Sequence, residues 1–190
     1  MCPTVKICPL HSPPTRPIVD MHGMVKNPLS RSEPIPLDSA LPLAYSELVP
    51  ETSFASPGFE YLTDERALPA RVRGALRIVP LQERVRHRTA QGATGRSGGP
   101  QFQGGHIVAV SLGGIASGPN LMPQNHNFNV SAYARLEHGW RRALGEGTSV
   151  EVDIALTLDP NPVVPQFVVV TYWEDGAEWE HAFINEPNAQ

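Results

Sequence analysis

Residues 103–142 bring together five polar side chains of the kinds that hydrolytic enzymes use. They are His106, Asn120, Asn129, Glu137 and Arg141. A histidine whose pKa is near about 6.5 can take a proton from water. Mg²⁺ prefers oxygen ligands and keeps most of its waters, so one asparagine oxygen and a substrate phosphate can hold it. An arginine presents a planar fork of donors to phosphate. The set suits metal-assisted hydrolysis of a phosphodiester, in which water is deprotonated and developing charge is neutralised.

The segment around the histidine predicts a loop followed by a strand. Gly92–Gly99 is rich in glycine and is expected to be a loop that leads toward His106. Ile107–Val110 is a short apolar run with glycine breakers beyond it, so we expect His106 to open a strand. Asn120–Gln124, with the sequence Asn-Leu-Met-Pro-Gln, follows these breakers.

The residues after this segment predict a helix that carries the remaining polar groups. Between Val130 and Leu144 apolar residues recur at spacings of three and four, and Asn129 stands at the N-cap position. At about 100° per residue, Glu137 lies about 80° and Arg141 about 120° around the helix from Asn129. All three side chains can therefore flank one cleft.

The order of these motifs resembles the DNA/RNA non-specific endonucleases, a superfamily with a ββα-metal finger. Gly105-His106 is similar to the end of the family's Asp-Arg-Gly-His motif, and Asn120–Gln124 to its Asn-x-x-Pro-Gln segment. Phe128–Glu137 is similar to the helix that opens with Asn and carries Leu-Glu. The family's Asp and Arg are Gln103 and Gly104 here, and Gly-Gly-His at this place resembles the toxin domains of bacterial secreted effectors.

The resemblance implies a role for each matched residue. His106 would be the general base, and Asn129 would be the direct ligand of Mg²⁺, with Mn²⁺ a candidate substitute. Glu137 would hold a metal-bound water, and Arg141 would contact phosphate. Asn120 is a further catalytic candidate, although an asparagine after Gly-Pro also commonly closes a turn. The substrate-binding candidates are Arg88, Arg96 and Gln124.

A cluster of arginines precedes the histidine. Residues 64–96 contain eight arginines against three acidic residues, in a chain whose net charge is −4. Such a segment would attract a polyanion even though the whole chain is mildly acidic. Because the family's motif arginine is absent at Gly104, we expect an upstream arginine to supply the missing phosphate contact.

Each of these features also has an ordinary structural explanation. A histidine after two glycines is commonly a turn residue, and asparagine is among the best N-cap residues. Glu137 and Arg141 form an i, i+4 pair of a kind worth only about 0.3 to 0.5 kcal/mol, and the arginines could form a solvated face.

Two other classes of function stay open: a nucleic-acid-binding module that retains the finger without turnover, and a protein-interaction domain that works through its proline-rich arm.

Composition divides the chain after residue 57. Residues 1–57 contain eleven of the twenty prolines, which excludes a long helix or a central strand and predicts an extended arm or linker that packs partly on the rest. Residues 58–190 are predicted to form an α+β nuclease domain, with the ββα-metal finger beside a central antiparallel sheet and few helices. The strands predicted outside the finger are residues 59–62, 75–79, 150–158, 167–173 and 178–184, with turns at 159–162 and 175–176.

The N-terminal residues and the two cysteines near them bear on where the protein acts. No apolar run approaches the roughly 20 residues of a membrane span, and residues 1–6 lack the apolar stretch of a secretory signal. Cys2 and Cys8 lack the close spacing of structural zinc motifs, and they could form a disulfide in an exported chain.

The toxin resemblance implies secretion by a dedicated bacterial system and action in the cytoplasm of the target cell. The implied substrate is DNA, with RNA as a second candidate. It also implies a cognate immunity protein, and a secretion adaptor engaged by the N-terminal arm.

Overall fold

The computed structural model describes residues 33–37, 43–126, 128, 132–157 and 163–186. The expected metal ligand Asn129, both cysteines and the expected turn at 159–162 lie outside these ranges. Within the described residues, no helix is long and apolar enough to cross a membrane.

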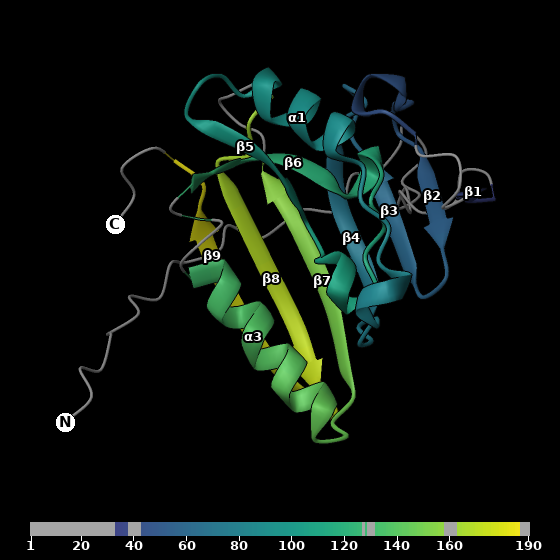
Figure 1. Cartoon of the computed structure of the whole chain (residues 1–190), viewed down its shortest axis with the longest axis vertical. Helices are drawn as coiled ribbons and strands as arrows, with labels where there is room; N and C mark the ends of the chain where they lie inside the picture. Colours follow the sequence, from purple (N-terminus) through teal and green to yellow (C-terminus); the bar gives the residue numbers. More distant parts are fainter. Residues whose placement is uncertain (1–32, 38–42, 127, 129–131, 158–162, 187–190) are drawn as a thin grey trace, which may run out of the picture. The chain divides into compact units, whose positions relative to one another are not determined.

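A seven-stranded sheet is the largest element of the fold (Figure 1). Its spatial order is β1-β2-β3-β4-β7-β8-β9, and neighbouring strands are antiparallel except for β1 and β2. The strands are β1 (Ile35–Pro36), β2 (Ser53–Ser56), β3 (Phe59–Thr63), β4 (Pro69–Ala75), β7 (Val150–Thr157), β8 (Phe167–Glu174) and β9 (Ala177–Ile184). Side chains alternate between the two faces of a strand, and Val72, Ile154 and Val170 lie opposite one another on the buried face.

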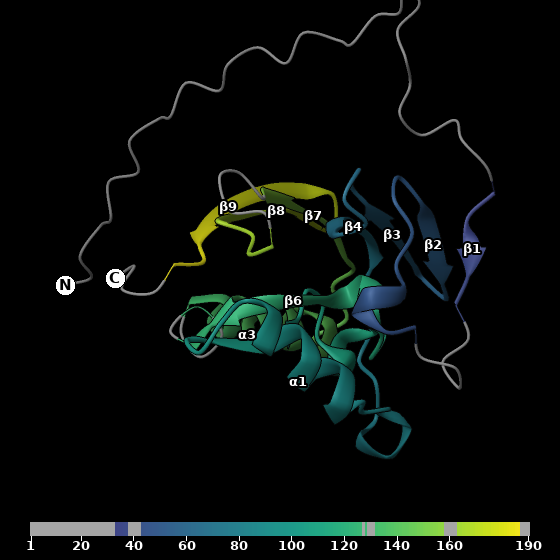
Figure 2. The same cartoon turned by 90° about the horizontal axis from the view of Figure 1, so that it is seen from above.

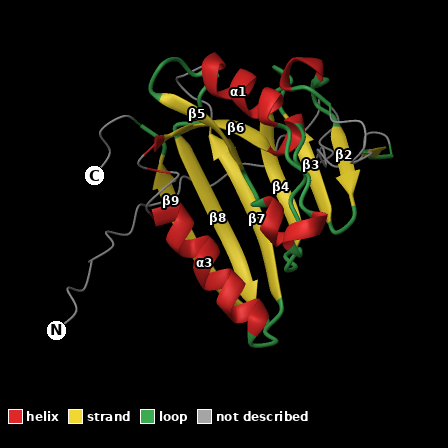
Figure 3. Ribbon diagram, viewed as in Figure 1, coloured by secondary structure: helices red, strands yellow, loops and turns green. Residues whose placement is uncertain are grey.

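One face of this sheet is covered by the other elements (Figure 2). β5 (Phe102–His106) and β6 (Leu121–Asn125) form a separate two-stranded antiparallel sheet. α1 (Arg88–Ser97) and α3 (Ala132–Gly145) lie on the same side of the large sheet as this pair, and Figure 3 shows them in red. The arrangement is the α+β fold predicted from the sequence, with a central antiparallel sheet and few helices among the described residues.

Helix α3 is fixed to the sheet by aromatic side chains. Trp140 packs edge-on against Tyr172 of β8, with ring centroids 5.5 Å apart. Near the other end of the helix, Tyr133 stacks on Phe128 at 4.8 Å and meets Phe183 of β9 edge-on at 5.4 Å. The apolar stripe that predicted this helix is therefore the stripe that it buries, and its described residues confirm the prediction.

Most of the predicted strands are also confirmed. Those at 59–62, 150–158, 167–173 and 178–184 correspond to β3, β7, β8 and β9. Asp175 and Gly176, which join β8 to β9, have φ values of 46° and 85°. Positive φ at both central residues is the requirement of the tight hairpin turn that matches strand twist, and the Asp-Gly pair supplies it.

The expected loop at 92–99 is wrong for residues 92–97, which belong to helix α1, and only Gly98 and Gly99 lie beyond its end. Glycine disfavours helix on its own by about 1 kcal/mol per residue relative to alanine. Here its small size has a packing use, since a Cβ on Gly95 would lie 2.6 Å from the backbone nitrogen of Gly104 in β5. A helix with side chains at this contact could not approach the strand so closely.

Two predicted strands are also placed differently. The expected strand at 75–79 lies earlier, as β4, and the backbone nitrogens of Arg77 and Val79 bond instead to the carbonyls of Leu112 and Ser111. His106 ends β5 rather than opening a strand, and residues 107–112 form an irregular segment that finishes in a 3-10 turn, η3 (Val110–Leu112). An apolar run without alternation marks burial, and it does not identify a strand by itself.

The residues before position 58 contribute to the described structure. β1 and β2 form one edge of the sheet, and Phe54 of β2 is buried in the core. The boundary expected after residue 57 falls in the turn between β2 and β3. Only β1, which contains Pro36, is an edge strand, and proline is tolerated there because an edge strand leaves one row of backbone donors unpaired. β2 is paired on both sides, so the expectation that residues 1–57 form no strand inside the sheet is wrong for β2, whose four residues include no proline.

Candidate active site

His106 is held at the end of β5 by its pairing with β6. The side chain of Gln124 lies across Gly105 and donates from Nε2 to the carbonyl oxygen of His106 at 2.9 Å. A Cβ on Gly105 would lie 1.9 Å from Gln124 Oε1, so only glycine leaves room for this bond. Gln124 is 1% exposed. Its contacts are those of a residue that positions His106, whereas the sequence led us to expect a substrate contact.

The His106 ring is largely withdrawn from water. Its Nε2 is buried without a hydrogen-bond partner among the described residues, and its Nδ1 lies 3.5 Å from Nε2 of Gln91 in α1. Burial lowers the pKa of His106 to about 4, since desolvation disfavours the charged ring. The imidazole is therefore neutral at physiological pH, which is the form that can accept a proton.

Asn120 fixes the course of the chain directly after His106. Its Oδ1 accepts from the backbone nitrogen of Val108 at 2.9 Å, and its Nδ2 donates to the carbonyls of Val108 and Ile115 at 2.8 and 2.7 Å. The side chain is fully buried. These contacts indicate a positioning residue, where the sequence had suggested a catalytic one, because both amide hydrogens are used to hold buried backbone.

Helix α3 meets the segment after His106 along one stripe. Side chains one turn apart on the helix bond to every second residue of the segment. The three pairs are Tyr133 with the carbonyl of Ile107, Glu137 with the backbone N–H of Ala109, and Arg141 Nη2 with Ser111 Oγ at 2.7 Å. Side chains at i, i+4 and i+8 share a helix face, and Ile107, Ala109 and Ser111 lie along that face. The structure thus brings Glu137 and Arg141 to the segment that begins at His106.

Glu137, like His106, has a pKa that burial shifts strongly. Burial raises the pKa of Glu137 to about 7, and the charge of Arg141 and the Ala109 N–H act in the opposite direction. A carboxyl in this state carries a negative charge for only part of the time near neutral pH, and a cation placed beside it would favour the ionised form. In the described part of the chain, no three His, Cys, Asp or Glu side chains gather as a metal cluster.

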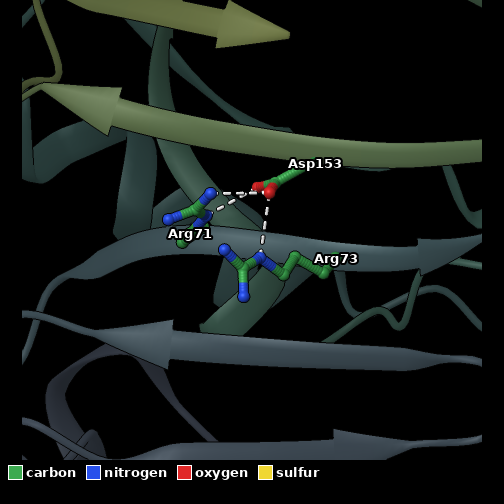
Figure 4. Close-up of polar contacts among 3 residues, drawn as sticks. All are labelled: Arg71, Arg73 and Asp153. Atoms are coloured by element: carbon green, nitrogen blue, oxygen red, sulfur yellow. Dashed lines mark hydrogen bonds and ion pairs between the residues drawn. The ribbon is translucent and has the colours of Figure 1, made fainter. Parts of the chain in front are cut away.

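Four of the eight clustered arginines already have hydrogen-bond partners within the protein. Arg71 and Arg73 both bind the Asp153 carboxylate, with nitrogen–oxygen distances of 2.6 to 2.9 Å (Figure 4). They alternate with the buried Val72, so they lie on the sheet face opposite α3. Arg66 pairs with Asp64 at 3.2 Å. Arg84 donates to the carbonyl oxygen of Val79 at 2.9 Å.

The two arginines chosen from the sequence as substrate contacts differ in position. Arg88 and Arg96 are both exposed residues of α1. Gln91 faces His106 from this helix, and Arg88 lies one turn before it, about 60° around the axis, while Arg96 lies about 140° around. The helix therefore presents Arg88 toward the His106 side and turns Arg96 away from it.

Two residues of the site were not found from the sequence. Gln91 was overlooked because it precedes glycines that suggested a loop, and Ser111 because it follows a run expected to be a strand. The repeated glycines offered a signal for Gln91, since Gly95 in α1 and Gly104 in β5 are matched small residues at a close crossing. Ser111 had no comparable signal.

The parts of a ββα-metal finger are two antiparallel strands and a helix. Here they are β5 and β6, with the neutral His106 on β5, and α3, which carries the buried acid Glu137. Residues 50–176 match the family model described as DNA/RNA non-specific endonuclease. The matched region is more than half of the chain, and the chain belongs to this family. Its activity is accordingly that of a nuclease, with nucleic acid as substrate. Among curated proteins, none matches the chain.

Proposed function

We propose that the chain is a metal-dependent nuclease of low sequence specificity that acts as an antibacterial effector toxin. The observation that carries the catalytic part is the stripe of α3 contacts that joins Glu137 and Arg141 to the segment starting at the neutral His106. A base, an acid and a phosphate-binding cation on one rigid unit are what phosphodiester hydrolysis requires.

His106 would take the proton from the attacking water. Its ring is neutral because it is buried, Gln124 holds the carbonyl of His106, and Asn120 holds the backbone of Val108, two residues further on. A base fixed in place loses little entropy on reaching the transition state, and such orientation accounts for much of an enzyme's rate enhancement.

Arg141 would bind the non-bridging oxygens of the attacked phosphate. One of its donors is held by Ser111, and a guanidinium has five, so the group is oriented and still has donors for a substrate. Arg88, which α1 presents toward the His106 side, would bind a neighbouring phosphate and replace the arginine missing at position 104.

The site fits a metal held largely by water and phosphate. The buried Glu137 carboxyl has a raised pKa, so a cation or its bound water would stabilise the ionised form, and the amide oxygen of Asn129 would be the direct ligand. Mg²⁺ needs only one or two protein oxygens. Bound Mg²⁺ or Mn²⁺ would supply positive charge to the attacked phosphate and the leaving oxygen, and the products would carry 5′-phosphates.

Sequence preference should be weak. The groups assigned to substrate are arginines, and contacts to phosphate position a nucleic acid without reading its bases. We therefore include RNA beside DNA as a substrate.

The toxin role is supported by Gly104-Gly105-His106, the pattern that resembles the toxin branch of the family. It entails export by a dedicated bacterial secretion system, action in the cytoplasm of the target cell, and an immunity protein in the producing cell. The N-terminal arm would engage a secretion adaptor.

Two experiments test this proposal. Purified protein incubated with supercoiled plasmid or total RNA should degrade nucleic acid with Mg²⁺ or Mn²⁺ and leave it intact in EDTA. Expression in the bacterial cytoplasm should stop growth, and the His106→Ala variant should not. DNA binding without cleavage under any metal would instead favour the silent binding module, and cleavage without toxicity would remove the effector role while leaving the nuclease.

A further inference from the structure

Gln91 is the polar side chain that α1 directs at the His106 ring. Its Nε2 lies 3.5 Å from His106 Nδ1 and 3.4 Å from the carbonyl oxygen of Gly104. The residue is half-buried, like His106 itself. Through these two contacts, Gln91 binds both the imidazole and the strand that carries it.

The backbone fixes where this glutamine can be. A Cβ on Gly104 would lie only 1.8 Å from the carbonyl oxygen of Gln91, and one on Gly95 would lie 2.6 Å from the nitrogen of Gly104. Helix and strand thus meet backbone against backbone at this point, with no side chain between them. A glutamine placed by such a contact has little freedom in the position of its Cα, and its amide can be aimed reproducibly.

The two contacts of the amide favour one position for the proton of the ring. The amide nitrogen has two hydrogens, and one faces the Gly104 carbonyl, which can only accept. If the amide were turned over, its oxygen would lie against that carbonyl oxygen, and two acceptors would repel each other. With the amide in this orientation its second hydrogen faces Nδ1, an arrangement that suits an unprotonated Nδ1 and a proton on Nε2, the ring nitrogen that has no partner among the described residues.

We propose that Gln91 is a positioning residue that holds His106 in the Nε2-protonated tautomer, with the Nδ1 lone pair available as the base. This inference rests on the proposed function for its meaning, since a tautomer matters to a nuclease only if His106 is the base. A separation of 3.5 Å is long for a hydrogen bond. An attacking water can therefore replace the Gln91 amide as the donor to Nδ1, and no strong contact is lost.

The tautomer can be read directly, without any cleavage. Protein labelled with ¹⁵N in its histidines is studied by long-range ¹H–¹⁵N correlation at pH 7 in EDTA, and the His106 signals are assigned by their loss in His106→Ala. The wild-type ring should show an unprotonated Nδ1 and a protonated Nε2. In Gln91→Glu the carboxylate can only accept, so it should move the proton to Nδ1. Gln91→Met has a similar length and no donor, and should give a mixture of tautomers.

Kinetics provide the second readout. Gln91→Met should lower kcat by about tenfold and leave KM for plasmid DNA within about twofold, because the variant loses an aligned base and no substrate contact. Gln103→Met is the matched control, since this exposed glutamine lies on β5 three residues from His106, and it should change neither the ring signals nor kcat. Thermal melting of each variant separates misfolding from loss of alignment, and Gln91→Glu keeps the test open if Gln91→Met does not fold.

The outcomes are distinguishable. A wild-type ring protonated on Nδ1, or Gln91 variants with the wild-type tautomer and kcat, would overturn the role of Gln91. A ring whose tautomer follows Gln91 as described, in a protein that cleaves no nucleic acid, would support the positioning contact and contradict the nuclease function instead.

Discussion

Arg141 of α3 donates from Nη2 to Oγ of Ser111 at 2.7 Å, and this bond joins the helix to the segment that leaves His106. It is the last of three such contacts along one helix face, after those made by Tyr133 and Glu137. The bond orients a guanidinium that would otherwise sample many rotamers. We therefore expect both residues to contribute to cleavage, and Arg141 to contribute more than Ser111.

Ser111→Ala should lower cleavage by about threefold to tenfold, because Arg141 keeps its charge and loses only its orientation. Arg141→Ala should lower cleavage by about a hundredfold, because the charge on phosphate is lost as well. Steady-state rates on plasmid DNA, with melting temperatures measured in parallel, compare the two variants. Equal losses in both would mean that Arg141 acts only as a structural partner of Ser111.

Glu137 should make the stability of the protein depend on pH. The folded-state pKa is about 7, above the ordinary value of 4.5, so the protonated carboxyl stabilises the fold fully below about pH 4.5, and this contribution is lost as pH rises through 7. Glu137→Gln imitates the protonated form. In EDTA at pH 8 the variant should be more stable than wild type by about 2 to 3 kcal/mol, and the difference should vanish near pH 4.5.

Urea unfolding of both proteins across this pH range measures the difference. The same variant should lose most of its cleavage activity, so stability and activity would move in opposite directions. A difference in stability that does not change with pH would contradict the burial of an ionisable Glu137.

Gly105 and Gln124 should be coupled. Gly105→Ala would place a Cβ 1.9 Å from Gln124 Oε1, displace that side chain and break its bond to His106, at a cost of about 2 kcal/mol in stability together with a loss of activity. In Gln124→Ala the space is open, so adding Gly105→Ala should cost little more. A double-mutant cycle in unfolding free energy measures the coupling. Additive effects would show that the two residues are not in contact as described.

Asp153 should matter for stability and not for catalysis. It binds Arg71 and Arg73 on the sheet face opposite α3 (Figure 4). Asp153→Asn should lower stability by about 1 kcal/mol, since the pairs are partly exposed and the arginines remain solvated. Cleavage and DNA affinity should stay within about twofold of wild type. A large fall in DNA binding would place the substrate on this face and contradict the assignment of the site.

The sequence was most informative where a pattern has a single structural meaning. Alternation over residues 150–158 and the spacing of apolar residues up to Leu144 predicted β7 and the described part of α3, because each periodicity suits one element. His106, Glu137 and Arg141 were chosen by the order of motifs, and the structure brings all three to one segment. Their catalytic roles are predictions that the variants above test.

The sequence was least informative where packing overrides local preference. Glycines suggested a loop at 92–99, but Gly95 permits a close crossing that becomes visible only when Gly104 is beside it. Asn120 and Gln124 have the residue types of a catalytic site, and burial gives them backbone partners instead. Arg71 and Arg73 contribute to the basic patch that the sequence predicts. In the structure both bind Asp153, which is about eighty residues away in sequence.

The most direct test of the account is the cleavage rate of His106→Ala. The substrate is supercoiled plasmid with Mg²⁺, DNA affinity is measured separately in EDTA, and His138→Ala, which changes an exposed histidine of α3, is the matched control. We expect His106→Ala to lose about a thousandfold or more in rate with its DNA affinity unchanged, and His138→Ala to cleave like wild type. Cleavage by His106→Ala at the wild-type rate would contradict the assignment of His106 as the base and of this site as the active site.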